Sequence, residues 1–125
     1  MDARNAIEKK IASAKEIMEK YGYGNMFRQC FMNTVETTLT AEDDGTAFVI
    51  TGDIPAMWLR DSTLQVMHYM RFTDDESVRA LLRGLIEKQA QMINLDPYAN
   101  SYNHGPTGAH WTIDLPEPRD RKSVV

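Results

Sequence analysis

Cysteine is almost absent from this sequence, and long hydrophobic runs are absent altogether. Cys30 is the only cysteine among 125 residues, so no disulfide can form within the chain, as is usual for proteins of a reducing compartment. No window approaches the roughly 18 consecutive apolar residues of a transmembrane helix. The N-terminus, MDARNAIEKK, carries charges where a signal peptide needs an apolar core. We therefore expect a cytoplasmic protein that does not enter a membrane.

A basic surface is also missing. Eighteen acidic residues against fourteen basic ones give a net charge of −4, which disfavours nucleic acid as a partner because phosphate binding needs a positive face. The apolar fraction of 42% and the charged fraction of 26% are ordinary for a folded chain. This composition excludes a fully disordered or collagen-like protein.

The common catalytic and cofactor motifs do not occur either. The sequence has no glycine-rich phosphate loop, no G-x-S-x-G, no paired-cysteine spacing and no H-E-x-x-H. His68, His104 and His110 are scattered, so they predict no metal site, and we expect His68 to be packed or at the surface. We expect no metal and no cofactor.

Apolar periodicity predicts two helices at the start of the chain. Residues 2–21 have apolar residues at spacings of three and four, which is typical of an amphipathic helix, and Gly22 is suited to end it in the left-handed conformation. A second helix is expected over 26–33. The apolar faces are Ile7, Ile11, Ala14 and Met18 in the first helix, and Phe27, Cys30 and Phe31 in the second.

The period then changes from 3.6 to 2, which predicts a β-hairpin over 35–51. Val35, Thr37 and Leu39 alternate with polar residues, and residues 47–51 are rich in β-branched and aromatic side chains. The Asp-Gly step that ends at Gly45 is typical of a hairpin turn. An isolated hairpin is marginally stable, so we expect it to pack on something larger.

Two capping-box patterns predict two further helices. Ser62 and Gln65 indicate a helix that starts near Asp61 or Ser62, and Thr73 and Glu76 indicate one that ends near Asn94. The fold class expected is therefore mainly α, with a small β-hairpin. The predicted apolar faces are Leu64, Met67 and Met70, with Val66 and Tyr69 beside them, and Val78, Leu81, Leu82, Leu85, Ile86, Met92 and Ile93.

The segment TGDIPAMWLRDST, residues 51–63, gathers three residues suited to a sugar. Arg60 offers a planar fork of donors, Asp61 offers acceptors, and the face of Trp58 can stack on the apolar side of a sugar ring. The alternative is that Asp61 only caps a helix and that Arg60 is a solvated charge.

The segment DPYANSYNHGPTGAHW, residues 96–111, is dense in aromatic and amide side chains without either period. It is either a functional loop or a surface loop whose aromatic residues pack down as anchors. The spacing of the acids near the two segments singles out no catalytic pair. These acids are Asp53, Asp61, Asp96, Asp114 and Glu117.

The run GDIPAMWLRDST, together with DPYANSYN and the following G-x-H-W, resembles glycoside hydrolase family 125, the metal-independent exo-acting α-mannosidases. The resemblance covers about residues 15–119, including MFRQCFMNTVETTLT and the hairpin. It implies a fold of paired helices, an (α/α)6 toroid, of which this chain would form part. It also implies removal of a terminal α-1,6-linked mannose from a mannose-containing oligosaccharide, with inversion and without a metal.

The resemblance implies a set of sugar-binding residues. Trp58, Arg60 and Asp61 would hold the terminal sugar, and Tyr98, Asn100, Asn103 and His110 would form the pocket wall. The two catalytic glutamates of the family lie in later segments, the first soon after a Trp-Glu-Arg motif that would follow Arg119. We therefore assign no catalytic residue in this chain.

We expect residues 1–119 to be the N-terminal part of a glycosidase catalytic domain. Residues 120–125, Asp-Arg-Lys-Ser-Val-Val, are what a common sequencing adaptor encodes in one reading frame, so we expect them to be read-through. Two alternatives to the mannosidase remain open, namely a different (α/α)6 exo-glycosidase, such as an α-glucosidase, and a non-catalytic helical module that binds carbohydrate or protein.

Overall fold

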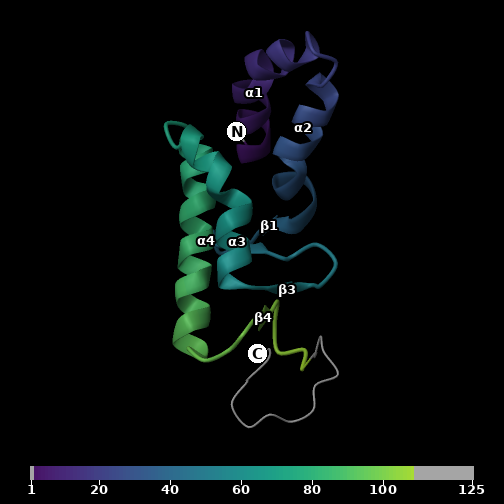
Figure 1. Ribbon diagram of the computed structural model, residues 1–125. Coiled ribbons are helices and arrows are strands. Elements are labelled where there is room, and N and C mark those ends of the chain that lie inside the picture. Colours follow the sequence, from purple (N-terminus) through teal and green to yellow (C-terminus); the bar gives the residue numbers. More distant parts are fainter. Residues whose placement is uncertain (1, 109–125) are drawn as a thin grey trace.

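The computed structural model describes residues 2–108 and is mainly helical, with two short antiparallel two-stranded sheets, one of which is a hairpin. This confirms the fold class predicted from the sequence (Figure 1). Helices α1 and α2 form one antiparallel pair, and α3 and α4 form another. The elements in chain order are α1 (Ala3–Glu19), α2 (Gly24–Asn33), a π-helical turn (Thr34–Thr38), β1 (Leu39–Ala41), β2 (Ala47–Val49), β3 (Ala56–Met57), α3 (Leu59–Val66), a 3-10 helix (Met67–Phe72), α4 (Glu76–Leu95) and β4 (Tyr102–Asn103).

The first helix pair follows the predicted pattern closely. Gly22, at φ +77°, ends α1 in the left-handed conformation, and Ile7 and Ile11 are buried as expected. In α2 the predicted face is shifted by about one residue. Met32 is fully buried, whereas Cys30 is exposed, because Phe27 and Phe31 pack on the core from the edge of the face.

The predicted hairpin is shorter than 35–51. Leu39 pairs with Val49, and Gly45, at φ +85°, makes the predicted turn. Residues 35–38, predicted as strand, are instead helical: the Thr37 and Thr38 hydroxyls bond to carbonyls four residues back. A few alternating β-branched residues fit a helix whose polar side chains bond locally as well as they fit a strand.

The start of α3 also differs from the prediction. It begins at Leu59, with Trp58 as the N-cap residue, so Asp61 lies in the first turn and is not the cap. The Ser62 hydroxyl donates to the Leu59 carbonyl and does not cap. α4 starts at Glu76, and the residue that caps it is Asp75 and not Thr73, the predicted cap. The Asp75 carboxylate accepts from the Ser77 and Val78 amides.

The core lies where the inner faces of α1, α3 and α4 meet the first hairpin. The predicted face Leu64, Met67 and Met70 is exposed, whereas the residues beside it, Val66 and Tyr69, are buried. Periodicity located an apolar helix correctly but not the side that packs. In α4 the residues Val78, Leu82 and Leu85 are buried, Leu81 and Met92 are partly buried, and Ile86 and Ile93 are exposed.

Tyr69 links the two helix pairs inside the core. Its hydroxyl donates to the Phe31 carbonyl at 2.9 Å and accepts from the Val35 amide at 3.2 Å. Burial raises the pKa of this phenol. His68 is packed, as predicted, with its ring edge-on against Phe31. Among the described helices none is long and apolar enough to cross a membrane.

Candidate functional site

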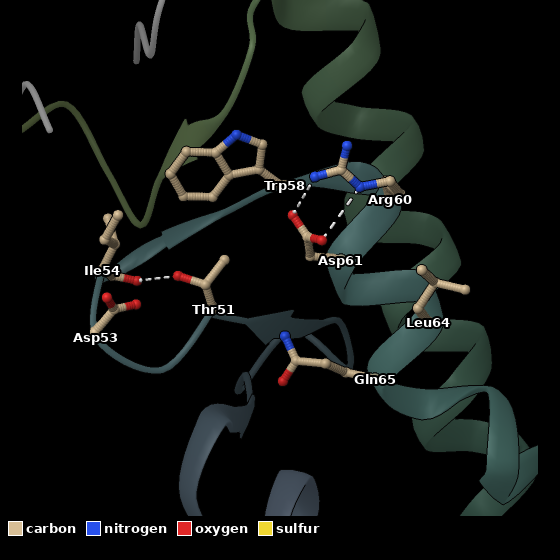
Figure 2. Close-up of a pocket in the computed structure, with 8 residues that line it drawn as sticks. All are labelled: Thr51, Asp53, Ile54, Trp58, Arg60, Asp61, Leu64 and Gln65. Atoms are coloured by element: carbon tan, nitrogen blue, oxygen red, sulfur yellow. Dashed lines mark hydrogen bonds and ion pairs between the residues drawn. The ribbon is translucent and has the colours of Figure 1, made fainter. Parts of the chain in front are cut away.

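A pocket of about 510 Å³ lies between the turn that follows β2 and the first turns of α3 (Figure 2). All eight of its lining residues in the described part of the chain come from the segment 51–65, so one short stretch of sequence builds both sides. Its lining residues are Thr51, Asp53, Ile54, Trp58, Arg60, Asp61, Leu64 and Gln65.

The structure brings together the three residues predicted at the centre of the site. Arg60 and Asp61 point toward one another on the same side of α3, and Trp58 lies at the helix start (Figure 2). Arg60 Nε is 3.3 Å from Asp61 Oδ1, and Nη2 is 3.2 Å from Oδ2. The remaining N–H bonds of this fork, and the remaining lone pairs of the carboxylate, are available to a ligand.

The two side chains of this ion pair differ in how far they are buried. The Asp61 side chain is 31% exposed, whereas that of Arg60 is 77% exposed. The carboxylate is thus held at the wall, and the longer guanidinium reaches over the pocket from its rim. The indole of Trp58 is partly buried and adds an apolar face beside these polar groups.

Two anchors fix the start of α3. Strand β3, just before Trp58, pairs with β4 so that Ala56 lies opposite Asn103. On the other side, Gln89 of α4 donates to the Ser62 hydroxyl at 2.8 Å and to the Thr63 hydroxyl at 3.0 Å. The first turn of α3 is therefore held by main-chain pairing and by a side-chain clamp.

The opposite wall is the turn that follows β2. The Thr51 hydroxyl donates to the Ile54 carbonyl at 3.1 Å, and Gly52, at φ +124°, adopts a conformation that a side chain would strain. This tight turn presents Asp53, which is exposed, to the pocket. The Gly-Asp-Ile-Pro breaker in the sequence was the available indication of such a turn.

Sequence patterns did not identify Leu64 and Gln65 as pocket residues. Both lie about one helical turn after Asp61, at positions i+3 and i+4, and so share its face of α3. Helical spacing from Asp61 would have found them once the helix start was known.

The second predicted segment supports the site from behind. Asn103 and Tyr102 form β4 and are buried, and the Tyr102 hydroxyl donates to the Asp96 carbonyl at 2.9 Å. Tyr98, 81% exposed, and Asn100, also exposed, do not line the pocket. His110 lies outside the described residues.

Asp53 and Asp61 are the carboxylates that line the pocket within residues 2–108. No group of three or more histidine, cysteine or acidic residues in that part of the chain could hold a metal ion. The geometry therefore suits hydrogen bonding to a polar ligand with one apolar face.

Most of the chain matches a known family of enzymes. The model of the metal-independent alpha-mannosidases, GH125, matches residues 22–124. The chain belongs to the GH125 family. The match reaches into residues 120–125, which lie outside the described part, and their origin as read-through stays a prediction.

Two relatives show how much of a GH125 protein this chain represents. A solved Streptococcus pneumoniae structure, a metal-independent alpha mannosidase in a non-productive complex with alpha-1,6-mannobiose, has a TM-score of 0.77 and 34% identity, over 85% of this chain and 25% of that one. The Meiotically up-regulated gene 157 protein of Schizosaccharomyces pombe is 37% identical over 102 residues, 78% of this chain and 20% of the relative. The chain thus spans a quarter or less of the length of these two relatives.

Proposed function

We propose that this GH125 chain supplies part of the terminal-sugar pocket of an inverting exo-α-1,6-mannosidase. The observation that carries the proposal is the pocket in which Trp58, Arg60 and Asp61 come together. It is supported by the family match and by the similar Streptococcus pneumoniae structure, a complex with alpha-1,6-mannobiose. We propose further that the rest of the (α/α)6 toroid, and a cytoplasmic location, belong to the complete protein.

The pocket chemistry fits a terminal mannose. One face of a sugar ring is lined by C–H bonds and stacks on the Trp58 indole, while the Arg60–Asp61 pair offers donors and acceptors to adjacent hydroxyls. A further sugar attached to those hydroxyls would leave the polar groups of the pair unmatched. This selects for a chain end and makes the hydrolysis exo-acting.

The proton transfers require two other groups. In inverting hydrolysis an acid protonates the glycosidic oxygen while a carboxylate activates water on the opposite face of the ring. Asp61 is committed to Arg60 by two contacts, so its role is to hold the sugar. We assign the acid and the base to the later segments of the complete protein.

The test is mannose release from α-1,6-mannobiose by the complete protein, with Arg60→Ala and Asp61→Ala combined. Each hydrogen bond to a charged group contributes about 1.5–3 kcal/mol, so we expect kcat/KM to fall at least about 100-fold. Arg71→Ala, an exposed arginine of the 3-10 helix, is the control and should retain activity. Unchanged release by the double variant, or preference for α-glucosides over α-mannosides, contradicts the proposal.

The 125-residue chain by itself should release no mannose, because it holds the sugar without the acid and base. Incubation of the purified chain with α-1,6-mannobiose, followed by detection of free mannose, checks this. Sustained release would place both catalytic groups within the chain.

A further inference from the structure

Gln65 lies where the two walls of the pocket meet. It comes from α3, and its side-chain amide reaches across to the end of the first hairpin (Figure 2). Its Oε1 accepts from the Thr38 hydroxyl at 3.0 Å, and its Nε2 donates to the Ile50 carbonyl at 3.0 Å. The amide thus joins α3, the π-helical turn and the segment after β2.

These two contacts fix which way the amide points. The Ile50 carbonyl can only accept a hydrogen bond, so the nitrogen of Gln65 must face it and the oxygen must face Thr38. The Ile50 amide donates in turn to the Thr38 carbonyl at 3.0 Å, which holds these two partners in place. The amide cannot flip without setting one oxygen against another.

One polar group of Gln65 is left unused by this arrangement. The amide nitrogen carries two N–H bonds, and the Ile50 carbonyl takes one of them. Within residues 2–108 no protein acceptor takes the second. In Figure 2 the nitrogen lies on the Thr51 side of the amide, toward the pocket, and the oxygen lies on the far side.

We propose that Gln65 is a sugar-contacting residue that donates its second N–H to one hydroxyl oxygen of the terminal sugar. This inference rests on the proposed function. Asp61 presents acceptors on the same face of α3, whereas Gln65 presents a fixed donor one turn further on. Asp61 accepts a hydrogen bond from one hydroxyl, and Gln65 donates one to another. The pocket therefore selects sugars whose hydroxyls match both positions.

The experiment is a double-mutant cycle on the complete protein. The parent and Gln65→Met are assayed on α-1,6-mannobiose and on analogues in which one hydroxyl of the terminal mannose at a time is replaced by hydrogen. We expect Gln65→Met to lower kcat/KM about tenfold on the parent sugar, or about 1.4 kcal/mol. We expect that penalty to vanish on one analogue, the one that lacks the contacted hydroxyl.

Thr38→Val is the matched control for structural damage. It removes the anchor of the Gln65 oxygen but leaves the donor, so its penalty should be the same on every analogue. A Gln65→Met penalty that is uniform over all analogues, or no penalty at all, overturns this inference and leaves the proposed function standing. If the parent protein releases no mannose from α-1,6-mannobiose, both fail together.

Discussion

The inner and outer faces of the α3–α4 region are both apolar, yet only one of them packs. On the inner side Val66, Tyr69 and Leu82 are almost fully buried. On the outer side Leu64 is 56% exposed and Ile86 is 62% exposed. An apolar face in the sequence therefore predicts that a helix packs against something. The burial of each side chain shows which of these faces pack within the described residues.

The outer face agrees with the limited share of a GH125 protein that the chain represents. The similar Streptococcus pneumoniae structure is covered over only 25% of its length. A contiguous apolar surface on a protein marks a contact with something else. On the proposed function, the remaining helices of the toroid cover Met67 and Met70, whereas Leu64 faces the pocket.

The largest expected effect separates the two faces directly. Leu82→Ala opens a cavity in the inner face and should lower the free energy of unfolding by about 2–5 kcal/mol. Ile86→Ala, on the same helix but the outer face, should change it by less than about 0.5 kcal/mol. Urea unfolding of the chain, followed by circular dichroism, measures both. Equal losses would show that both faces are packed.

Gly84 offers a sharper test because two effects oppose one another there. Helix propensity alone favours alanine by about 1 kcal/mol. A Cβ at Gly84 would, however, lie 2.4 Å from the Gly45 carbonyl oxygen in the hairpin turn, and backbone moves only at a cost. We expect Gly84→Ala to destabilise by about 1–3 kcal/mol in the same unfolding assay.

The control is Gly105→Ala, since nothing lies within 4 Å of a Cβ there. Its stability should stay near that of the parent. Stabilisation by Gly84→Ala would mean that α4 does not press against the hairpin.

A smaller effect is expected from the polar link inside the core. Tyr69→Phe removes the hydroxyl that donates to the Phe31 carbonyl and accepts from the Val35 amide, which should cost about 1–2 kcal/mol. The Phe31 carbonyl keeps a contact with His68 Nε2 at 3.0 Å. Tyr21→Phe is the matched control, because Tyr21 is 72% exposed and its hydroxyl faces water. The two variants are compared by thermal unfolding, and equal melting temperatures would exclude the buried link.

The smallest effect concerns Glu36, which lies in the π-helical turn and forms ion pairs with Arg28 of α2 and Arg4 of α1. Hydrogen bonds from Arg28, and then from Arg4, lower the pKa of Glu36. A lowered pKa means that this stabilisation is present above the pKa of the unfolded state and is lost as the pH falls through the pKa of the folded state. Glu36→Gln should therefore flatten the acid side of a stability profile.

The measurement is urea unfolding at a series of pH values from neutral to strongly acidic. Glu87→Gln, at an exposed position of α4, should leave the profile of the parent unchanged. A steep acid loss that persists in Glu36→Gln would assign it to another carboxylate.

The sequence predicted the features that depend on residues close together in the chain. Gly22 and Gly45 adopt the conformations that glycine permits, and the motif of Trp58, Arg60 and Asp61 forms one site because these residues are adjacent in sequence. The roles of these three residues in sugar binding stay a prediction.

Features that depend on distant partners could not be predicted. Residues 35–38 are helical in the structure, where the Val35 amide meets the Tyr69 hydroxyl, 34 positions away. The choice of Val66 over Leu64 as a buried residue depends on which side of α3 meets its neighbours. The contact of Gln65 with Thr38 likewise joins segments that sequence spacing does not relate.

The pairing of β3 with β4 joins two segments that lie far apart in the sequence. Ala56 opposite Asn103 is a register, and a shift of one residue along a strand turns every side chain to the other face. The pairing thus ties the segment just before Trp58 to the connection that follows α4. A change in this register would therefore disturb the site without altering any residue that lines it.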